Sequence, residues 1–474
     1  MTAAPATVAD APAGVPTARQ VRTRLRRARS RHHDHSLGDV LGDAYVIVLF
    51  VGMYGWFAIS ASRNLLDSPT VGQAEPGVRW WLAVAALLAG AGLAWRGLRA
   101  LGPLLVTPAT QSWATSAPVD RRAWLAPRFV LLLVGAAAGT AALAVAVAAL
   151  AGVGEPAALG WAAAAGAGWG VAALALSVVA QSSRSGRRWP TVAGAVPMAA
   201  AAVITAVVVL VGRLGDGLPR PATTPTVALV AVAVPLAVVG TVRAVRALPR
   251  VDRASLTTGA QFANAAATAT ILLDPSLLAG LVESRRWRRI GRVRSSRRFL
   301  PGPGWWALLQ ADVRRLRRHP SAVLIWAALL GVQYAAALAL PGLAGAAQVV
   351  FAYLAADRLT GGLRAVSRSP GLRRALGGSD NLLRGIHVVV PAVGAGLWWL
   401  LTLPTVDPGP AWLAPTLALG VVAAAFRAGT RPPIDYGGAT VNTPFGMVPV
   451  DLLRQGSRGP ALLAVLVLVQ LFLG

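Results

Sequence analysis

The chain has 474 residues, of which 55% are hydrophobic and only 13% are charged, and its formal net charge is +27. An ordinary soluble domain is about 25% charged, so this composition excludes a typical water-soluble fold and predicts a chain that buries its apolar surface in lipid or against itself. Neither cysteine nor lysine occurs; this excludes disulfides, iron–sulfur clusters and zinc–thiolate sites, and also a P-loop, whose lysine contacts nucleotide phosphates.

Residues 1–43 form the predicted N-terminal segment, which is basic and cytosolic. Residues 1–18 lack a periodic pattern and are expected to be a disordered tail, whereas residues 19–31 hold seven arginines. A helix on the membrane surface or facing an ATPase fits this pattern, and so does a simple topology anchor. The cluster His32-His33-Asp34-His35 resembles a metal-binding tract, but its cationic neighbours would repel a metal ion, so we interpret it as part of a solvated tail.

Residues 44–243 are predicted to form a first transmembrane half. Apolar stretches of about 20 residues can cross a hydrocarbon core of ~30 Å. Six such stretches lie at residues 44–62, 79–97, 129–151, 157–181, 191–212 and 225–243.

Residues 244–320 form a basic cytosolic connector. Asp274-Pro275-Ser276 predicts the start of a helix there, because aspartate suits the N-cap and proline the first helical position. We interpret the apolar stretch 256–282 as an interfacial helix rather than a twelfth span, because arginine clusters flank it. The second half, residues 321–474, has five predicted spans at residues 321–339, 343–357, 385–403, 412–427 and 459–474.

The arginines predict the orientation of these spans. If each stretch crosses the bilayer, only Arg63, Arg79, Arg213 and Arg220 reach the outer face, and the other 41 stay on the cytosolic side. Because basic loops resist translocation, the predicted fold class is all-α: a polytopic helical membrane protein of about 11 transmembrane helices, with the N-terminus in the cytosol and the C-terminus outside. We therefore expect the basic loops to face anionic lipid headgroups rather than nucleic acid.

Ionisable side chains are almost absent from the predicted spans. His387 is the one candidate inside the membrane, and we expect a packed or interfacial histidine rather than a proton relay. Gln333 and Gln348 could form hydrogen bonds between spans, and Trp398-Trp399 is predicted to lie at the outer interface. With no paired carboxylates or catalytic triad in the sequence, we expect neither enzymatic activity nor a cofactor or metal site.

Glycines four residues apart recur in two predicted spans, as Gly135 with Gly139 and as Gly166 with Gly170. Small side chains at this spacing let two helices approach closely. In a chain so rich in alanine and glycine, ordinary helix packing is an equally good interpretation.

The two halves look like a duplication. Pro118-Val-Asp-Arg-Arg lies between the second and third spans of the first half, and Pro370-Gly-Leu-Arg-Arg lies at the same place in the second half. A basic helix also precedes each half, around residues 24–31 and around residues 314–318. Both halves begin with the same predicted orientation, which indicates a parallel repeat whose second copy has only five spans.

The loops at residues 98–128 and 358–384 carry the most distinctive motif. Ser116-Ala-Pro-Val-Asp-Arg-Arg follows Thr107-Pro-Ala-Thr and leads to Arg128-Phe. It resembles the first intracellular loop of ABC-2-type exporter permeases, in which a Pro-x-x-Arg-Arg-like turn opens a short coupling helix that seats on the ATPase subunit. The second loop departs from this pattern, because Ser369-Pro370 replaces Ser-Ala-Pro.

The resemblance implies two permease units fused in one chain and a separate ABC-type ATP-binding subunit as partner. The residues that it implies for contact with this partner are Ser116, Pro118, Asp120, Arg121, Arg122, Pro370, Arg373 and Arg374. An alternative is that these arginines serve only as topology signals. The chain also resembles an uncharacterised membrane family of high-GC Gram-positive bacteria, the actinobacteria, which implies a multi-pass protein of the bacterial plasma membrane.

The sequence thus favours the permease subunit of an ATP-driven exporter, with any ATPase activity in the partner. Its apolar spans suit a lipid-like, peptide-like or drug-like substrate. Two rivals stay open: an ATP-independent carrier or scramblase, which would work without an ATPase, and a membrane scaffold, which would bind a cytosolic protein without moving a substrate.

Overall fold

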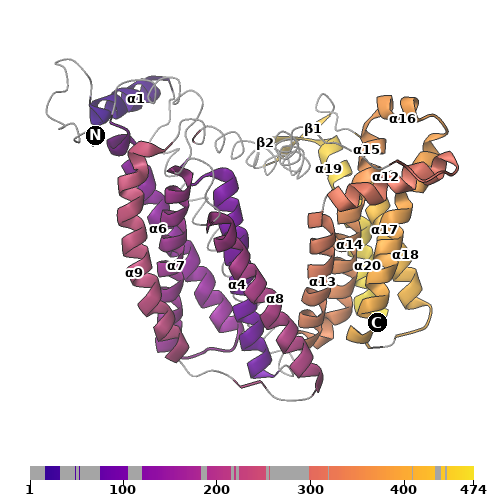
Figure 1. Ribbon diagram of the computed structural model, residues 1–474, viewed down its shortest axis with the longest axis horizontal. Coiled ribbons are helices and arrows are strands. Elements are labelled where there is room, and N and C mark those ends of the chain that lie inside the picture. Colours follow the sequence, from indigo (N-terminus) through magenta and orange to yellow (C-terminus); the bar gives the residue numbers. More distant parts are fainter. Residues whose placement is uncertain are drawn as a thin grey trace. The chain divides into compact units, whose positions relative to one another are not determined.

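The computed structural model describes residues 17–32, 75–104, 120–182, 189–214, 218–219, 224–251, 298–318, 320–407, 409–432, 439–443 and 446–473, together with Leu49, Met53 and Leu256. Within these residues the chain is helical apart from one short hairpin (Figure 1). It divides into two compact units: residues 1–67, 86–201 and 220–264 form the first, and residues 68–85, 202–219 and 265–474 form the second. The helices α4 and α8 contribute to both units.

Described helices account for ten of the eleven predicted spans; the first, residues 44–62, lies outside the described residues apart from Leu49 and Met53. Seven of the described helices are long and apolar enough to cross a membrane. The predicted fold class, a polytopic helical membrane protein, is therefore confirmed, while the orientation stays a prediction. The ten helices are α4 (Pro76–Leu101), α6 (Arg121–Leu150), α7 (Pro156–Ser182), α8 (Trp189–Leu214), α9 (Thr224–Ala247), α13 (Pro320–Ala339), α14 (Ala344–Leu359), α17 (Asp380–Thr402), α18 (Leu413–Gly429) and α20 (Pro460–Leu473).

In the first unit, α7 packs between α6 and α9. A Cβ atom at Gly166 or Gly170 of α7 would overlap Thr140 of α6, so the close approach of these two helices needs glycine. At Gly135 and Gly139, by contrast, a Cβ atom would meet no described residue within 4 Å. After α9 the chain makes a single turn, η1 (Leu248–Arg250).

A basic helix, α1 (Ala18–His32), packs against the start of α6. The Arg22 guanidinium lies 5.9 Å from the centre of the Trp124 ring, and Ala18 is buried. This is the helix expected before the first half. Of the histidine cluster, only His32 lies within the described residues, at the end of α1.

In the second unit, α14 is surrounded by α13, α17, α18 and α20. The three short helices α14, α18 and α20 have 16, 17 and 14 residues. At 1.5 Å per residue they extend ~21–26 Å, which is less than the thickness of a typical hydrocarbon core. The long helices α13 and α17 reach past them. Single turns, η2 (Pro341–Leu343) and η3 (Leu403–Thr405), connect the helices at one end.

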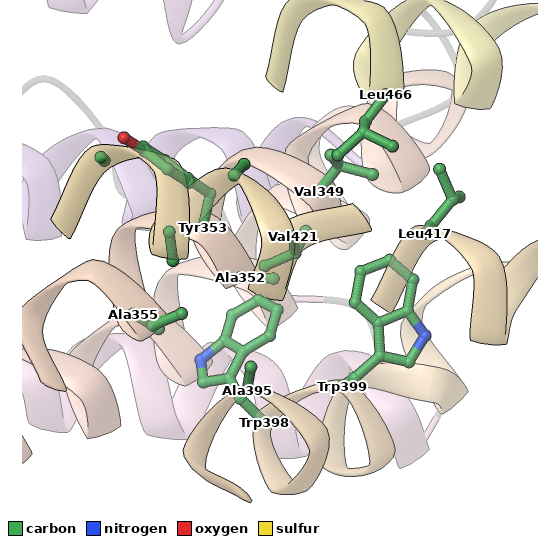
Figure 2. Packing of buried hydrophobic residues seen from close by; sticks show 14 of the residues in the cluster. Val349, Ala352, Tyr353, Ala355, Ala395, Trp398, Trp399, Leu417, Val421 and Leu466 are labelled. Carbon is green, nitrogen blue, oxygen red and sulfur yellow. The ribbon is translucent and has the colours of Figure 1, made fainter. Parts of the chain in front are cut away.

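The core of this unit lies around two tryptophans (Figure 2). Trp398 is 0% exposed and Trp399 is 5% exposed, and both pack with Leu417 and Val421 of α18. Both indole rings are therefore packed inside the bundle, and their predicted level at the membrane interface stays a prediction. The neighbouring α14 presents alanines to α17 and α18, and the small side chains leave room for two indole rings inside the bundle.

Glutamine side chains join the helices of the second unit, as predicted. Gln333 Nε2 on α13 donates to the Ala344 carbonyl and to Thr405 Oγ1, both at 3.0 Å. Gln348 Nε2 on α14 donates to Thr402 Oγ1 on α17, also at 3.0 Å. A buried amide needs such partners, because no water reaches it in an apolar bundle.

The second unit has one strongly basic end. All described arginines between residues 298 and 473 lie in helix ends or connections on this side, whereas the described parts of the connections at the other end, 340–343 and 403–412, contain none. We call it the basic end. Figure 1 shows α12 (Gly304–Arg318), α15 (Gly361–Arg368) and α16 (Pro370–Leu376) at the end of the bundle opposite the C-terminus.

The described residues of the segment after α18 are structured, in agreement with the expectation for residues 428–458. It forms a hairpin in which β1 (Thr440–Thr443) pairs antiparallel with β2 (Gly446–Pro449), followed by α19 (Val450–Gly456). The interfacial helix expected at 256–282 and the start expected at Asp274-Pro275-Ser276 lie outside the described residues, apart from Leu256.

Candidate partner-docking site at the basic end

The amphipathic helix α12 is fixed to the bundle through a buried aspartate–histidine contact. Asp312 Oδ2 lies 2.6 Å from His387 Nδ1 of α17, and the two residues are 6% and 4% exposed. His387 is therefore a packed histidine, as the sequence led us to expect, but its partner is a carboxylate. Because a hydrogen-bonded polar group tolerates burial far better than an unpaired one, the contact is a strong constraint on where α12 can lie.

Helix α15 packs against the same Asp312 side chain. A Cβ atom at Gly362 would overlap the Asp312 carboxylate, so α15 can begin there only with glycine. Arg315 of α12 donates from Nη1 to the Gly361 carbonyl at 2.7 Å. The imidazole Nε2 of His387 is buried and has no hydrogen-bond partner among the described residues. Three helices, α12, α15 and α17, thus converge on one buried polar pair.

Helix α15 is also joined to the end of α14. Asp357, in the last turn of α14, forms an ion pair with Arg364 of α15. Thr360 Oγ1 donates to the Asp357 carbonyl at 2.7 Å, and Leu363 and Val366 are buried beneath the helix. The result is a compact platform of α12 and α15, which covers the basic end of the bundle.

Helix α16 follows this platform, and local residues define its start. Ser369 is its N-cap, with Oγ accepting a hydrogen bond from Leu372 N at 3.2 Å, and Pro370 occupies the first helical position. The helix ends at Gly377, whose φ of +71° lies in the left-handed region that favours glycine. Both ends of this seven-residue helix are therefore encoded locally.

The two arginines predicted in this loop have different surroundings. Arg373 points back toward the platform: it donates to the carbonyls of Val366 and Ser367 at 3.0 and 2.8 Å, and it lies 3.0 Å from Asp380 at the start of α17. Arg374 is exposed. Arg373 thus holds α16 to the platform, and of these two arginines only Arg374 is exposed.

No residue of α16 is buried. Leu372 and Leu376 are 38% and 42% exposed, and they lie four residues apart, on one face of the helix. A short helix that is rigidly held yet shows two leucines and an arginine to solvent has the composition of a protein-binding element.

The first loop is described only at its end. Ser116 and Pro118 lie outside the described residues. Asp120 is the N-cap of α6, where its carboxylate accepts hydrogen bonds from the backbone N–H of Arg122 at 2.9 Å and of Ala123 at 3.3 Å. Arg121 is half-buried and Arg122 is exposed. The structure therefore gives Asp120 a local capping role, which the sequence analysis had not assigned.

The surroundings of the two loops correspond. In each half, the basic helix that precedes the spans packs against the start of the helix that follows the Pro-x-x-Arg-Arg motif: α1 against α6, and α12 against α17. The contact is made by Arg22 with Trp124 in one half and by Asp312 with His387 in the other. This shared arrangement supports the duplication proposed from the sequence.

Residues 72–439 match the family of unknown function DUF6297. The chain belongs to this family. No curated protein and no solved structure matches the chain. The DUF6297 match contains α4 to α18, and therefore the whole site built by α12, α15, α16 and α17, whereas α1, the hairpin, α19 and α20 lie outside it. The family description names no activity, and it does not identify an ABC-2 permease.

Proposed function

We propose that this DUF6297 protein is the membrane-spanning permease subunit of an ATP-driven exporter, and that α16 docks on a separate ATP-binding subunit. The observation that carries the proposal is the presentation of α16: both helix ends are capped, the base is pinned by Arg373, and Leu372, Leu376 and Arg374 are exposed. Leucines in this setting gain free energy when a partner's groove covers them.

A path for mechanical coupling runs from α16 into the bundle. Arg373 joins α16 to Asp380, the first residue of α17, and His387 joins α17 to α12 two turns later. A partner that displaces α16 therefore moves α17 and α12 with it, because packed, hydrogen-bonded elements shift as units. Such a linkage is what an ATPase would need in order to drive a membrane bundle.

The first half would contribute the equivalent contact. Arg121 and Arg122 lie at the start of α6, which corresponds to α17 in the repeat. With α1 beside it, this end also presents a basic surface. We propose that the two loops contact the two copies of an ATPase dimer, and that the substrate is amphiphilic because the described spans offer almost no charged side chain.

Co-purification tests this proposal. The tagged chain is isolated from its native membranes, and the ATP-binding subunit is identified by mass spectrometry. We expect L376D to weaken its recovery by at least about 30-fold, since a central apolar anchor contributes ~2 kcal/mol or more to an interface, and R374E to lower it further. L300D and R317E are matched controls, because Leu300 is 64% exposed and Arg317 is an exposed arginine of α12.

Two results would count against the proposal. One is recovery of the same ATP-binding subunit with wild-type chain and L376D alike, which would remove α16 from the interface. The other is substrate movement by the purified chain in liposomes without any ATPase, which would favour the ATP-independent carrier or scramblase.

A further inference from the structure

The segment after α18 closes a pocket at the basic end that the proposed function does not use. The pocket has a volume of about 580 Å³ and lies between the end of α18, α19 and the start of α20. Most of the described residues that line it are polar or charged. The side chains that line it include Arg427, Asp451, Arg454, Gln455, Ser457 and Arg458.

The pocket is fixed to the bundle at two points. Arg431 Nη2, just past α18, donates to the Gly456 carbonyl at the end of α19 at 3.0 Å. At the turn into α20, a Cβ atom at Gly459 would lie 2.8 Å from the Ala428 Cβ and 2.9 Å from the Tyr353 hydroxyl, which leaves space only for glycine. These contacts hold α19 and the start of α20 against α14 and α18, and they therefore keep the arginines of the pocket at a fixed spacing.

Among the described residues that line the pocket, the charges are unbalanced. Three arginines, Arg427, Arg454 and Arg458, face one carboxylate, Asp451, which accepts a hydrogen bond from Gln455 Nε2 at 2.6 Å. None of the three arginines forms an ion pair with another described residue. A concave site with a surplus of guanidinium groups binds an anion that can accept several charge-assisted hydrogen bonds, and phosphate has the matching geometry.

The position of the pocket indicates where the phosphate comes from. Arg427 lies in the last turn of the apolar helix α18, and Ala461 lies in the first turn of the apolar helix α20. Both helices therefore leave the apolar layer at this level, where lipid headgroups are located. Basic pockets between transmembrane helices on this side of a membrane are suited to anionic headgroups.

We infer that the α18–α19–α20 pocket binds a phosphate group, and that an anionic phospholipid supplies it. The lipid phosphate would lie against Arg427, Arg454 and Arg458, and its acyl chains would run along the apolar faces of α18 and α20. This role holds the 428–458 segment against the membrane and is independent of whether α16 docks on an ATPase.

The test uses the full chain in nanodiscs. The melting midpoint is measured in phosphatidylcholine alone, with a series of added phosphatidylglycerol fractions, and in phosphatidylcholine with inorganic phosphate in solution. The melting midpoint of the wild type is expected to rise as phosphatidylglycerol is added. In R454Q/R458Q, the phosphatidylglycerol fraction that gives half of this rise should be about 25-fold higher, at about fivefold for each arginine removed. R454K/R458K keeps both charges and should recover most of the loss. R317Q/R374Q, exposed arginines at the same end, is the matched control.

The three lipid and phosphate conditions, measured on each variant, distinguish the possible results. A response to phosphatidylglycerol that R454Q/R458Q loses and R317Q/R374Q keeps supports the lipid assignment. An equal response to inorganic phosphate, lost in the same variant, supports the phosphate site but assigns a soluble source. An unchanged half-saturating fraction in R454Q/R458Q, with a wild-type melting midpoint in phosphatidylcholine, overturns the site.

Discussion

Replacing His387 by leucine removes the partner of a carboxylate that is only 6% exposed. With Nδ1 no longer 2.6 Å away, Asp312 stays buried without its hydrogen-bond partner. Leaving a buried polar group without a partner costs ~1–3 kcal/mol. Because the Asp312–His387 contact joins α12 to α17, we expect the cost to appear as local opening of α12, with its backbone amides exchanging at least about fivefold faster.

Hydrogen exchange of the purified chain, followed by mass spectrometry on peptides of α12, measures this opening. The double variant D312L/H387L is expected to exchange more slowly than H387L, since replacing both polar partners by apolar groups leaves no buried polar atom unpaired. V313A, on the 44% exposed neighbour of Asp312, is the control and should change the exchange little. Two results would contradict this expectation. One is an unchanged exchange rate of α12 in H387L, and the other is a double variant whose exchange rate equals the summed effects of H387L and D312L.

Two further pairs of substitutions, one pair in each unit, test the packing. G170L should lower the melting midpoint, because a side chain there overlaps Thr140 and overpacking costs ~1–3 kcal/mol. G135A, with no described residue beside it, should be neutral or slightly stabilising. Equal effects of the two substitutions would contradict the α6–α7 contact. Q348L should destabilise by ~0.6–2 kcal/mol through loss of the 3.0 Å bond to Thr402, and T402V should add little on that background; strict additivity in chemical or thermal unfolding would show that the two side chains do not interact.

The candidate site could be predicted only in part. The motif loops, the capped start of α16 and the basic helix before each half follow from local sequence, because caps and charge runs act over a few residues. Asp312 was missed, although it is the only acidic residue of α12. Its partner His387 lies 75 residues away, and no local pattern joins the two. The internal role of Arg373 was likewise decided by where Asp380 falls after the turn at Gly377.

The basic pocket shows the same limit. Each of its arginines is visible in the sequence as a charge near a helix end, which is also what a topology signal looks like. Arg427 precedes the hairpin and Arg458 follows α19. The two arginines come together only because the chain folds back from α19 to the end of α18. Their surplus of charge is therefore a property of the folded segment rather than of any stretch of sequence.

By itself, the sequence determined that the chain is a bundle of apolar helices and which end of each helix carries arginine. Hydrophobic length and charge placement are local properties, and lipid or a packed core enforces them residue by residue. It could also nominate Gln333 and Gln348 as side chains that need partners. Only the tertiary structure decided that Trp398 and Trp399 lie in a core and that Asp312 meets His387, because burial and pairing depend on which helices become neighbours, and that is settled by packing between residues far apart in the chain.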